Sequence, residues 1–281
     1  MFPNSDVEPL VVRQRGTSAR AGHRALLLHG LGSSESCWDS FIDHRPPELD
    51  LWTAGLPWRS GGPYAVAGRA ESEWIASAIR QVPGGADVVI AHSYATILLM
   101  ELLSDLAVAG VHPREELGVR AVVLVSPFYR KHPNDFTWAE LPGNLTAMRR
   151  SAEDHIELMS RNGLAPGLRA DMAELACARL GPYWAVRYLD AYLRTPFLAL
   201  ERIDLPVHLV VGDNDPVAPP AEAEALAGEL GGHASIERID GCGHTPMAER
   251  PERFSLAVQQ FLATLSAGTP RRRPTEYGST R

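Results

Sequence analysis

The stretch VVIAHSYATILLM, residues 88–100, decides the fold of this chain. Residues 88–91 form a continuous apolar run, which is typical of a β-strand covered on both faces. A helix is predicted to begin directly after Ser93. A strand that passes into a helix through so tight a turn forces the Ser93 hydroxyl outward at the carboxyl end of the sheet, where open α/β sheets bind ligands.

Two interpretations of Ser93 follow from this segment alone. Serine is a preferred helix N-cap residue, so its role could be simply to begin the helix. The N-terminus of that helix also directs backbone N–H groups and a positive dipole end toward Ser93, which favours a developing oxyanion and therefore a nucleophile. The choice between these two interpretations depends on other motifs of the chain.

Short apolar runs alternate with longer helical patterns along most of the chain. This alternation predicts an α/β fold, in which helices flank a mostly parallel central sheet. The predicted strands are 24–28, 49–53, 88–91, 120–125, 207–211 and 235–239, and the predicted helices are 66–81, 94–109, 221–230 and 251–265.

One segment, residues 128–200, interrupts the alternation, because it has no good strand, only helical patches at 148–162, 170–179 and 184–193. We predict a helical cap inserted between two parts of a core, 1–127 and 201–266. The segment is rich in aromatic residues, which either pack its helices onto the core or form the apolar substrate wall of a lid. Ligand sites are mostly apolar and favour such junctions, so the lid is preferred. The candidate substrate-binding residues are Trp58, Phe128, Trp138, Trp184 and Tyr188.

The composition is ordinary for a soluble globular protein, with 281 residues of which 45% are apolar and 22% charged. A formal net charge of -7 gives no support for nucleic-acid binding. The chain shows neither a signal-peptide pattern at its start nor a run of about 20 apolar residues that could span a membrane. Its three cysteines form no metal-binding pattern, which favours a reduced, cytoplasmic setting. Residues 267–281 are predicted to be a disordered tail.

Three further polar motifs each follow a predicted strand. They read LLLHGLGS (residues 26–33), LVVGDNDPV (209–217) and IDGCGHTPM (239–247). The second motif offers two acids, Asp213 and Asp215, of which Asp213 could instead form an Asx turn at the strand end. In the third motif, His244 lies in a glycine-rich loop, which indicates a catalytic base rather than a buried histidine on the apolar face of a helix.

With these motifs the chain resembles the α/β-hydrolase superfamily, from about Val11 to Leu265. The nucleophile motif of that family is Gly-x-Ser-x-Gly, and this sequence has Ala91 and Ala95 in the glycine places. The flanking residues must be small because strand and helix approach closely there, and alanine is the next smallest residue. The departure from the family pattern is therefore mild.

The resemblance implies a catalytic triad. Ser93 is the nucleophile and His244 its base, while Asp215, preferred over Asp213, orients the base. The order serine, aspartate, histidine along the chain is the order that this fold requires. The ordered partners therefore favour the nucleophile interpretation of Ser93 over the helix cap.

The resemblance also implies an oxyanion hole, formed by the backbone N–H groups of Leu31 and Tyr94. The two histidines next to these motifs, His29 and His92, are expected to stabilise turns rather than to act in catalysis.

We predict a serine hydrolase that cleaves an ester-like bond of a small, apolar or aromatic substrate through an acyl-enzyme intermediate. No cofactor, metal ion, nucleic acid or membrane is expected as a partner, because the remaining histidines are scattered and no phosphate-binding glycine loop occurs. Two alternatives stay open. The same triad could serve C–C bond or thioester hydrolysis, acyl transfer or cyclisation, or the chain could be a non-catalytic ligand-binding protein on this scaffold.

Overall fold

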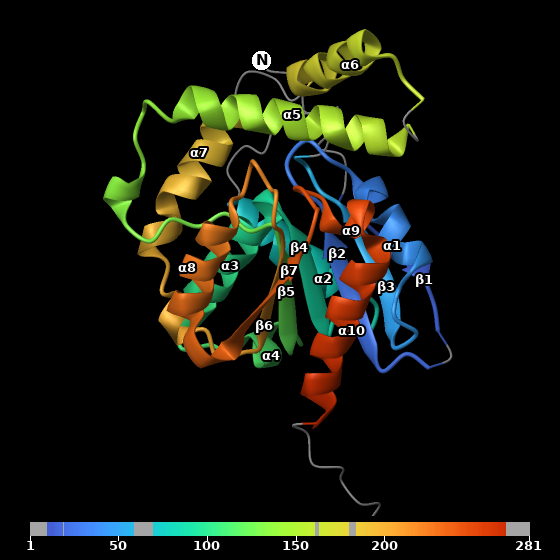
Figure 1. The fold of residues 1–281 in the computed structure, drawn as a ribbon. Coiled ribbons are helices and arrows are strands. Elements are labelled where there is room, and N and C mark those ends of the chain that lie inside the picture. Colours follow the sequence, from blue (N-terminus) through green and yellow to red (C-terminus); the bar gives the residue numbers. More distant parts are fainter. Residues whose placement is uncertain (1–9, 19, 59–69, 161–162, 180–183, 268–281) are drawn as a thin grey trace, which may run out of the picture.

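A seven-stranded sheet forms the centre of the computed structural model, which describes residues 10–18, 20–58, 70–160, 163–179 and 184–267 (Figure 1). The strand order is β1-β3-β2-β4-β5-β6-β7. β1 pairs with β3 in the antiparallel direction, and the other neighbours pair in parallel. The strands are β1 (Val11–Gly16), β2 (His23–Leu28), β3 (Leu49–Gly55), β4 (Val88–His92), β5 (Ala121–Val125), β6 (Val207–Gly212) and β7 (Ala234–Ile239).

Helices cover both faces of this sheet (Figure 1). Residues of α1, α9 and α10 join the core cluster on one face, and residues of α2, α3 and α8 join the cluster on the other. The bounds of these helices are α1 (Asp39–Asp43), α2 (Glu71–Gln81), α3 (Tyr94–Val108), α8 (Pro220–Leu230), α9 (Pro246–Glu249) and α10 (Pro251–Ala267), and a short helix α4 (Pro113–Glu116) precedes β5.

The residues of β4 explain why both faces need cover. Val89 and Ala91 lie in the core layer with α2, α3 and α8, whereas Val88 and Ile90 lie in the layer with α1, α9 and α10. Successive side chains of a strand point to opposite faces, so an apolar strand must be buried on both. Every residue of β4 and of β5 is buried. The predicted α/β fold with a mostly parallel sheet is confirmed.

Six of the strands lie within two residues of their predicted ends. β1 is the strand that the sequence does not predict, because its residues VVRQRG are mostly exposed at the antiparallel edge of the sheet and form no long apolar run. The predicted helix 66–81 is present as α2, and its first four residues lie outside the described residues. α10 extends to Ala267, and the rest of the predicted tail also lies outside them.

Among the described residues, three α-helices lie between β5 and β6, namely α5 (Leu141–Met159), α6 (Pro166–Arg179) and α7 (Trp184–Arg194). We call residues 128–200 the insertion. Figure 1 shows α5 and α6 crossing above the sheet, while α7 descends beside α3 and α8. Among the described residues, no helix combines the length and the apolar character that a membrane span requires.

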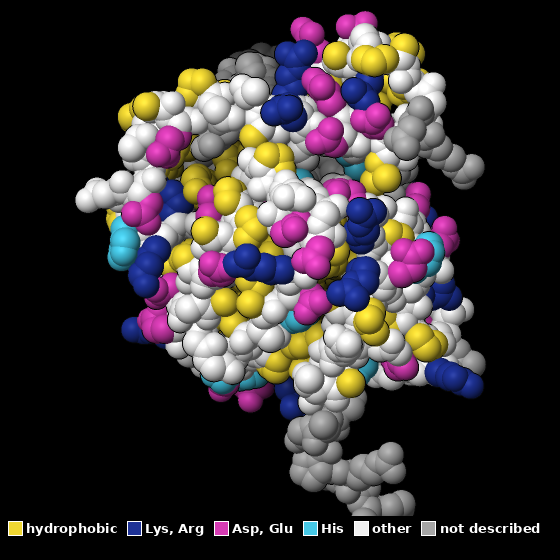
Figure 2. Space-filling model, viewed as in Figure 1, with side chains coloured by type: hydrophobic (Ala, Val, Ile, Leu, Met, Phe, Trp, Pro, Cys, Tyr) yellow, Lys and Arg dark blue, Asp and Glu magenta, His cyan; other side chains and the backbone are white. Residues whose placement is uncertain are grey.

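Acidic and basic side chains are interspersed over the face shown in Figure 2. Surface ion pairs such as Lys131 with Glu229 and Arg80 with Glu116 are largely exposed. Exposed pairs of this kind contribute at most about 1 kcal/mol each. The two apolar layers against the sheet, rather than these pairs, therefore account for most of the stabilisation of the fold.

Gly212, the last residue of β6, lies against the loop that follows β7. A Cβ at this position would lie 2.2 Å from the Gly243 carbonyl oxygen and 2.3 Å from that of Cys242. Both contacts are with backbone, so they cannot be relieved by a rotamer change. We expect Gly212→Ala to lower the free energy of unfolding by about 1–3 kcal/mol, as overpacking does, measured by denaturant unfolding.

Gly228→Ala in α8 is the matched control, because a Cβ there meets nothing within 4 Å. It should leave stability unchanged or raise it by up to about 1 kcal/mol, since alanine favours a helix over glycine. Equal stability of the two variants would contradict this account of the β6 end.

Candidate active site

Ser93 occupies a strained turn between β4 and α3. Its backbone angles, φ 57° and ψ -124°, are rare for a residue other than glycine and cost about 1–3 kcal/mol. The Ser93 N–H donates to the Val125 carbonyl, and Thr96 donates both its N–H and its hydroxyl to the Ser93 carbonyl. Gly30 approaches so closely that a Cβ there would lie 2.9 Å from the Ser93 Cβ. The turn thereby presents the Ser93 hydroxyl above the carboxyl end of β4.

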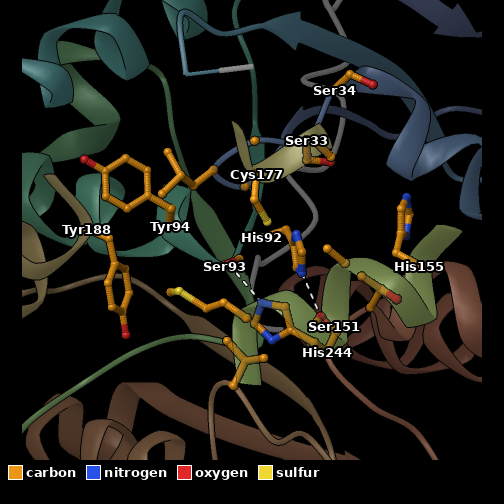
Figure 3. Close-up of a pocket in the computed structure, with 18 of the residues that line it drawn as sticks. Ser33, Ser34, His92, Ser93, Tyr94, Ser151, His155, Cys177, Tyr188 and His244 are labelled. Atoms are coloured by element: carbon orange, nitrogen blue, oxygen red, sulfur yellow. Dashed lines mark hydrogen bonds between the residues drawn. The ribbon is translucent and has the colours of Figure 1, made fainter. Parts of the chain in front are cut away.

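His244 follows β7 and faces Ser93 (Figure 3). Its Nε2 lies 3.0 Å from Ser93 Oγ, and its Nδ1 lies 2.8 Å from Asp215 Oδ2. An Nδ1–H that donates to a carboxylate leaves the lone pair of Nε2 to accept the serine proton. The structure thus brings together the three residues that the sequence motifs single out.

The loop that carries His244 is fixed on two sides. On one side, the Glu249 carboxylate accepts hydrogen bonds from the Gly243 N–H at 2.7 Å and from the Thr245 N–H and hydroxyl, each at 2.9 Å. On the other side, His92 Nε2 donates to the His244 carbonyl at 2.9 Å. These bonds limit the motion of the backbone that sets the direction of the imidazole.

Asp215 follows β6 and is buried. Its Oδ1 accepts the N–H groups of Val217 and Ala218, which leaves Oδ2 for His244. Burial favours a raised pKa, but His244 and the hydrogen bonds outweigh it, so the pKa of Asp215 lies below its ordinary value. The carboxylate is therefore ionised at neutral pH and can stabilise an imidazolium.

Asp213, the alternative acid, lies elsewhere. Its side chain accepts the Cys242 N–H at 3.2 Å, and its own N–H donates to the Ile239 carbonyl. It therefore ties the end of β6 to the loop after β7, and the structure places Asp215 rather than Asp213 in contact with His244.

Two further histidines, His29 and His92, are buried beside these loops. Burial lowers the pKa of His29 to about 4 and that of His92 to about 3, so both rings are neutral at pH 7. His29 Nδ1 donates to the Gly30 carbonyl, and its Nε2 accepts the Leu56 N–H. With the bond from His92 to the His244 loop, these contacts agree with the expectation that both residues stabilise turns.

A cavity of ≈ 320 Å³ opens beside Ser93, between the sheet and the insertion. Leu31 and Tyr94, the predicted oxyanion residues, line it. Phe128 and Tyr188 line it as well, with ring centroids 5.0 Å apart, and Phe128 also lies 5.8 Å from the His244 ring. Two of the predicted substrate-binding aromatics are thus adjacent to the reactive group.

The other aromatic candidates lie apart from the described cavity lining. Trp58 is buried behind the loop after β2, where its Nε1 donates to the His29 carbonyl and its ring meets that of Tyr94 edge-on. Trp138 is 71% exposed and packs on Phe136. Trp58 therefore packs within the core and Trp138 lies at the surface, and neither is part of the described cavity lining. The side chain of Trp184 lies outside the described part of the chain.

Three residues with a place at this site have no assigned role in the sequence analysis. Glu249 holds the His244 loop, and its signal was an acidic residue five positions after His244, at the start of the helical segment that follows the loop. Ser151 and His155 reach the cavity from α5, and their signal was a spacing of four residues on one helix. Without knowledge of which face of α5 turns inward, that spacing does not distinguish them from surface residues.

A hydroxyl, an imidazole and a buried carboxylate in sequential hydrogen-bond contact can generate a strong nucleophile at neutral pH. The described residues contain no group of three or more His, Cys, Asp or Glu side chains arranged to hold a metal ion. The hydrogen-bonded series of hydroxyl, imidazole and carboxylate, together with the mostly parallel sheet, defines a hydrolytic enzyme of the α/β class.

Comparison with known proteins identifies the family of the chain. Residues 25–257 match the model of the alpha/beta hydrolase family, and the chain belongs to this family. It is 27% identical over 258 residues to the pimeloyl-[acyl-carrier protein] methyl ester esterase of Aromatoleum aromaticum, covering 84% of this chain and 97% of that protein. It is 22% identical over 274 residues to the monoacylglycerol lipase abhd6-A of Xenopus laevis, covering 88% and 78%.

Solved structures show the same fold. A thermophilic esterase from Thermogutta terrifontis superposes with a TM-score of 0.63 at 18% identity, covering 91% of this chain and 93% of that one. MenH from S. aureus superposes with a TM-score of 0.62 at 14% identity, covering 92% and 98%.

Glu249 provides a test of how the His244 loop controls Ser93. Glu249→Ala removes three accepted hydrogen bonds and frees the loop. We expect the rate of Ser93 reaction with a fluorophosphonate to fall about tenfold to hundredfold, because small displacements of catalytic groups have effects of that size. Glu249→Gln keeps one acceptor oxygen and should react at an intermediate rate.

Glu252→Ala is the control for this variant, since that carboxylate is largely exposed and pairs with His44 at the surface. It should label within about twofold of the wild-type rate, the scatter expected of surface changes. Wild-type labelling of a folded Glu249→Ala protein would show that the loop does not depend on this carboxylate.

Proposed function

We propose that the protein is a serine esterase, which cleaves a small ester through an acyl-enzyme intermediate. The observation that carries this proposal is the unbroken chain of contacts from Asp215 through His244 to Ser93, at 2.8 and 3.0 Å, on the wall of a cavity. Asp215, whose pKa lies below its ordinary value, is ionised at neutral pH, as the reaction requires.

In the first half of the reaction, Ser93 Oγ attacks the ester carbonyl carbon while His244 Nε2 takes the serine proton. The carbonyl oxygen becomes an oxyanion, and we assign its stabilisation to the N–H groups of Leu31 and Tyr94, two residues that line the cavity with Ser93. The tetrahedral intermediate collapses with cleavage of the ester C–O bond. The leaving alcohol takes the proton from His244, and the acyl group remains on Ser93.

The second half uses water in place of the alcohol. His244 takes a proton from a water molecule while the oxygen of that water attacks the acyl carbon. Collapse of this intermediate returns the proton to Ser93 Oγ and releases the carboxylic acid. The imidazolium formed in each half is stabilised by Asp215, whose lowered pKa keeps it ionised.

The substrate is small and has an apolar or aromatic acyl group. A cavity of ≈ 320 Å³ lies at the lower end of the range for ligand sites. Phe128 of the insertion stands next to His244, and Tyr188 packs on Phe128, which supports a role of the insertion as a cap over the acyl group. The similarity to proteins named as a methyl ester esterase and a monoacylglycerol lipase favours an oxygen ester over thioester or C–C bond cleavage.

Ser93→Ala tests the nucleophile. We expect turnover of p-nitrophenyl butyrate to fall by about 10⁴-fold or more, the usual result of removing a triad serine, and labelling by a fluorophosphonate to cease. His244→Ala should have the same effects, because the hydroxyl then has no base.

Ser126→Ala is the matched control. Ser126 also has a positive φ, 48°, at the end of the adjacent strand, and its buried hydroxyl has no hydrogen-bond partner within the described structure. This variant should keep labelling and turnover. Full turnover by folded Ser93→Ala would refute the proposed mechanism, and a folded wild-type protein without labelling would favour a binding protein.

The apolar acyl side predicts a preference among simple esters. We expect kcat/KM for p-nitrophenyl butyrate to exceed that for the acetate by about tenfold, since each buried methylene contributes about 0.8 kcal/mol at most. Each value is divided by the rate of alkaline hydrolysis of the same ester, which removes differences in intrinsic reactivity. Equal normalised values would mean that the acyl group meets no apolar wall.

A further inference from the structure

The cavity beside Ser93 has two chemically different sides. In Figure 3, Tyr94 and Tyr188 lie on one side of Ser93, and Ser33, Ser34, Ser151 and His155 lie on the other. The esterase mechanism needs none of these four polar residues. A second set of polar groups in an otherwise apolar pocket is the usual means by which a site orients a ligand.

One face of α5 supplies half of the polar side. The α5 residues that line the cavity are Met148, Ser151, Ala152, His155 and Ile156. This spacing of three and four residues places all five on one side of a helix. Packing of the apolar members therefore also determines the position of the Ser151 hydroxyl and the His155 imidazole.

His155 has a buried nitrogen without a partner. Its Nδ1 is shielded from solvent and makes no hydrogen bond within the described structure. A ligand in the cavity cannot reach a nitrogen that is shielded from solvent, so His155 belongs to the polar side because its ring lines the cavity. Burial lowers the pKa of His155, so the ring is neutral at pH 7 and offers one donor and one acceptor.

The described lining of the cavity includes no Lys, Arg, Asp or Glu side chain. A carboxylate, phosphate or ammonium group on the ligand would therefore lack a counter-charge at the polar side. Neutral hydroxyl groups suit it, because a serine hydroxyl and a neutral imidazole can each both donate to and accept from them.

The polar side lies across Ser93 from Tyr188 (Figure 3). In the proposed esterase the acyl group meets Phe128 and Tyr188, whose rings are in contact. The leaving alcohol therefore extends toward Ser151 and His155 on the opposite side of Ser93, and it takes its proton from His244 Nε2.

We infer that Ser151 and His155 form a binding site for a hydroxyl-bearing, uncharged leaving alcohol, so that the preferred substrates are esters of small polyols. This inference rests on the proposed esterase function and adds the alcohol class to it. Ser151 and His155 act in substrate binding and take no part in the proton transfers of Ser93 and His244.

Two esters with the same acyl group test the inference, 1-butyrylglycerol and propyl butyrate. They differ by two hydroxyl groups on the alcohol, and the measured quantity is the ratio of their kcat/KM values. We expect the wild-type ratio to favour the glycerol ester by at least about tenfold, because a site built to pair with hydroxyl groups discriminates against an analogue that lacks them. His155→Phe and Ser151→Ala should each reduce this ratio several-fold, and the double variant should bring it close to one.

Arg150→Ala is the control on the same helix, because Arg150 is exposed and lies outside the cavity lining. It should leave the ratio unchanged. The alcohol site is overturned if the wild-type ratio of kcat/KM values is near one, or if the double variant keeps the wild-type ratio. Hydrolysis of both esters that depends on Ser93 would still support the esterase function in that case. Failure of the wild-type protein to cleave either ester or to be labelled at Ser93 overturns the esterase function and the alcohol site together.

Discussion

Ser93 keeps φ at 57° because two buried strands hold the turn from both sides. β4 leads into it, and the Ser93 N–H donates to the Val125 carbonyl at the end of β5. The conformation costs about 1–3 kcal/mol, which a buried, doubly covered sheet can offset and an exposed loop could not. β5 ends in the same way, with Ser126 at φ 48°, yet of the two serines Ser93 is the one that lines the cavity. Strain alone therefore does not mark the nucleophile, and the position of the imidazole does.

The parallel direction of the strands brings the partners of Ser93 to it. The carboxyl ends of β4, β6 and β7 lie at one edge, so the residues that follow them meet although up to 151 positions separate them in the sequence. The loops at this edge are also bonded to one another. Asp213 holds the loop after β7, and Glu249 and His92 hold it near His244. These neighbouring groups keep the imidazole in place without entering the reaction themselves.

The sequence predicts most of this arrangement because the motifs lie at strand ends, and the apolar runs of buried strands are easy to detect. It does not predict β1, whose polar edge position leaves no such run. The motif alone offers both Asp213 and Asp215, because two residues on one turn differ only in direction, and the family resemblance prefers Asp215. Hydrogen bonding within the folded loops puts Asp215 in contact with His244 and Asp213 in contact with the Cys242 N–H. Aromatic content predicted an apolar wall, but Trp138 and Trp58 pack elsewhere, since composition does not specify which face of a segment meets the core.

Reactivity and selectivity come from different parts of the chain. The reacting groups stand at the ends of strands, whereas most of the remaining cavity wall comes from the insertion and from the loop after β2, residues 30–36. Met148 and Ile156 line the cavity from the α5 face that carries Ser151 and His155, so a change in that face alters the pocket without altering the turn at Ser93. In the proposed esterase the triad carries out the reaction, and the α5 face, through Ser151 and His155, narrows the choice of ester. A purely apolar alcohol would leave the polar groups of that face without partners, whereas the hydroxyl groups of a polyol would pair with them.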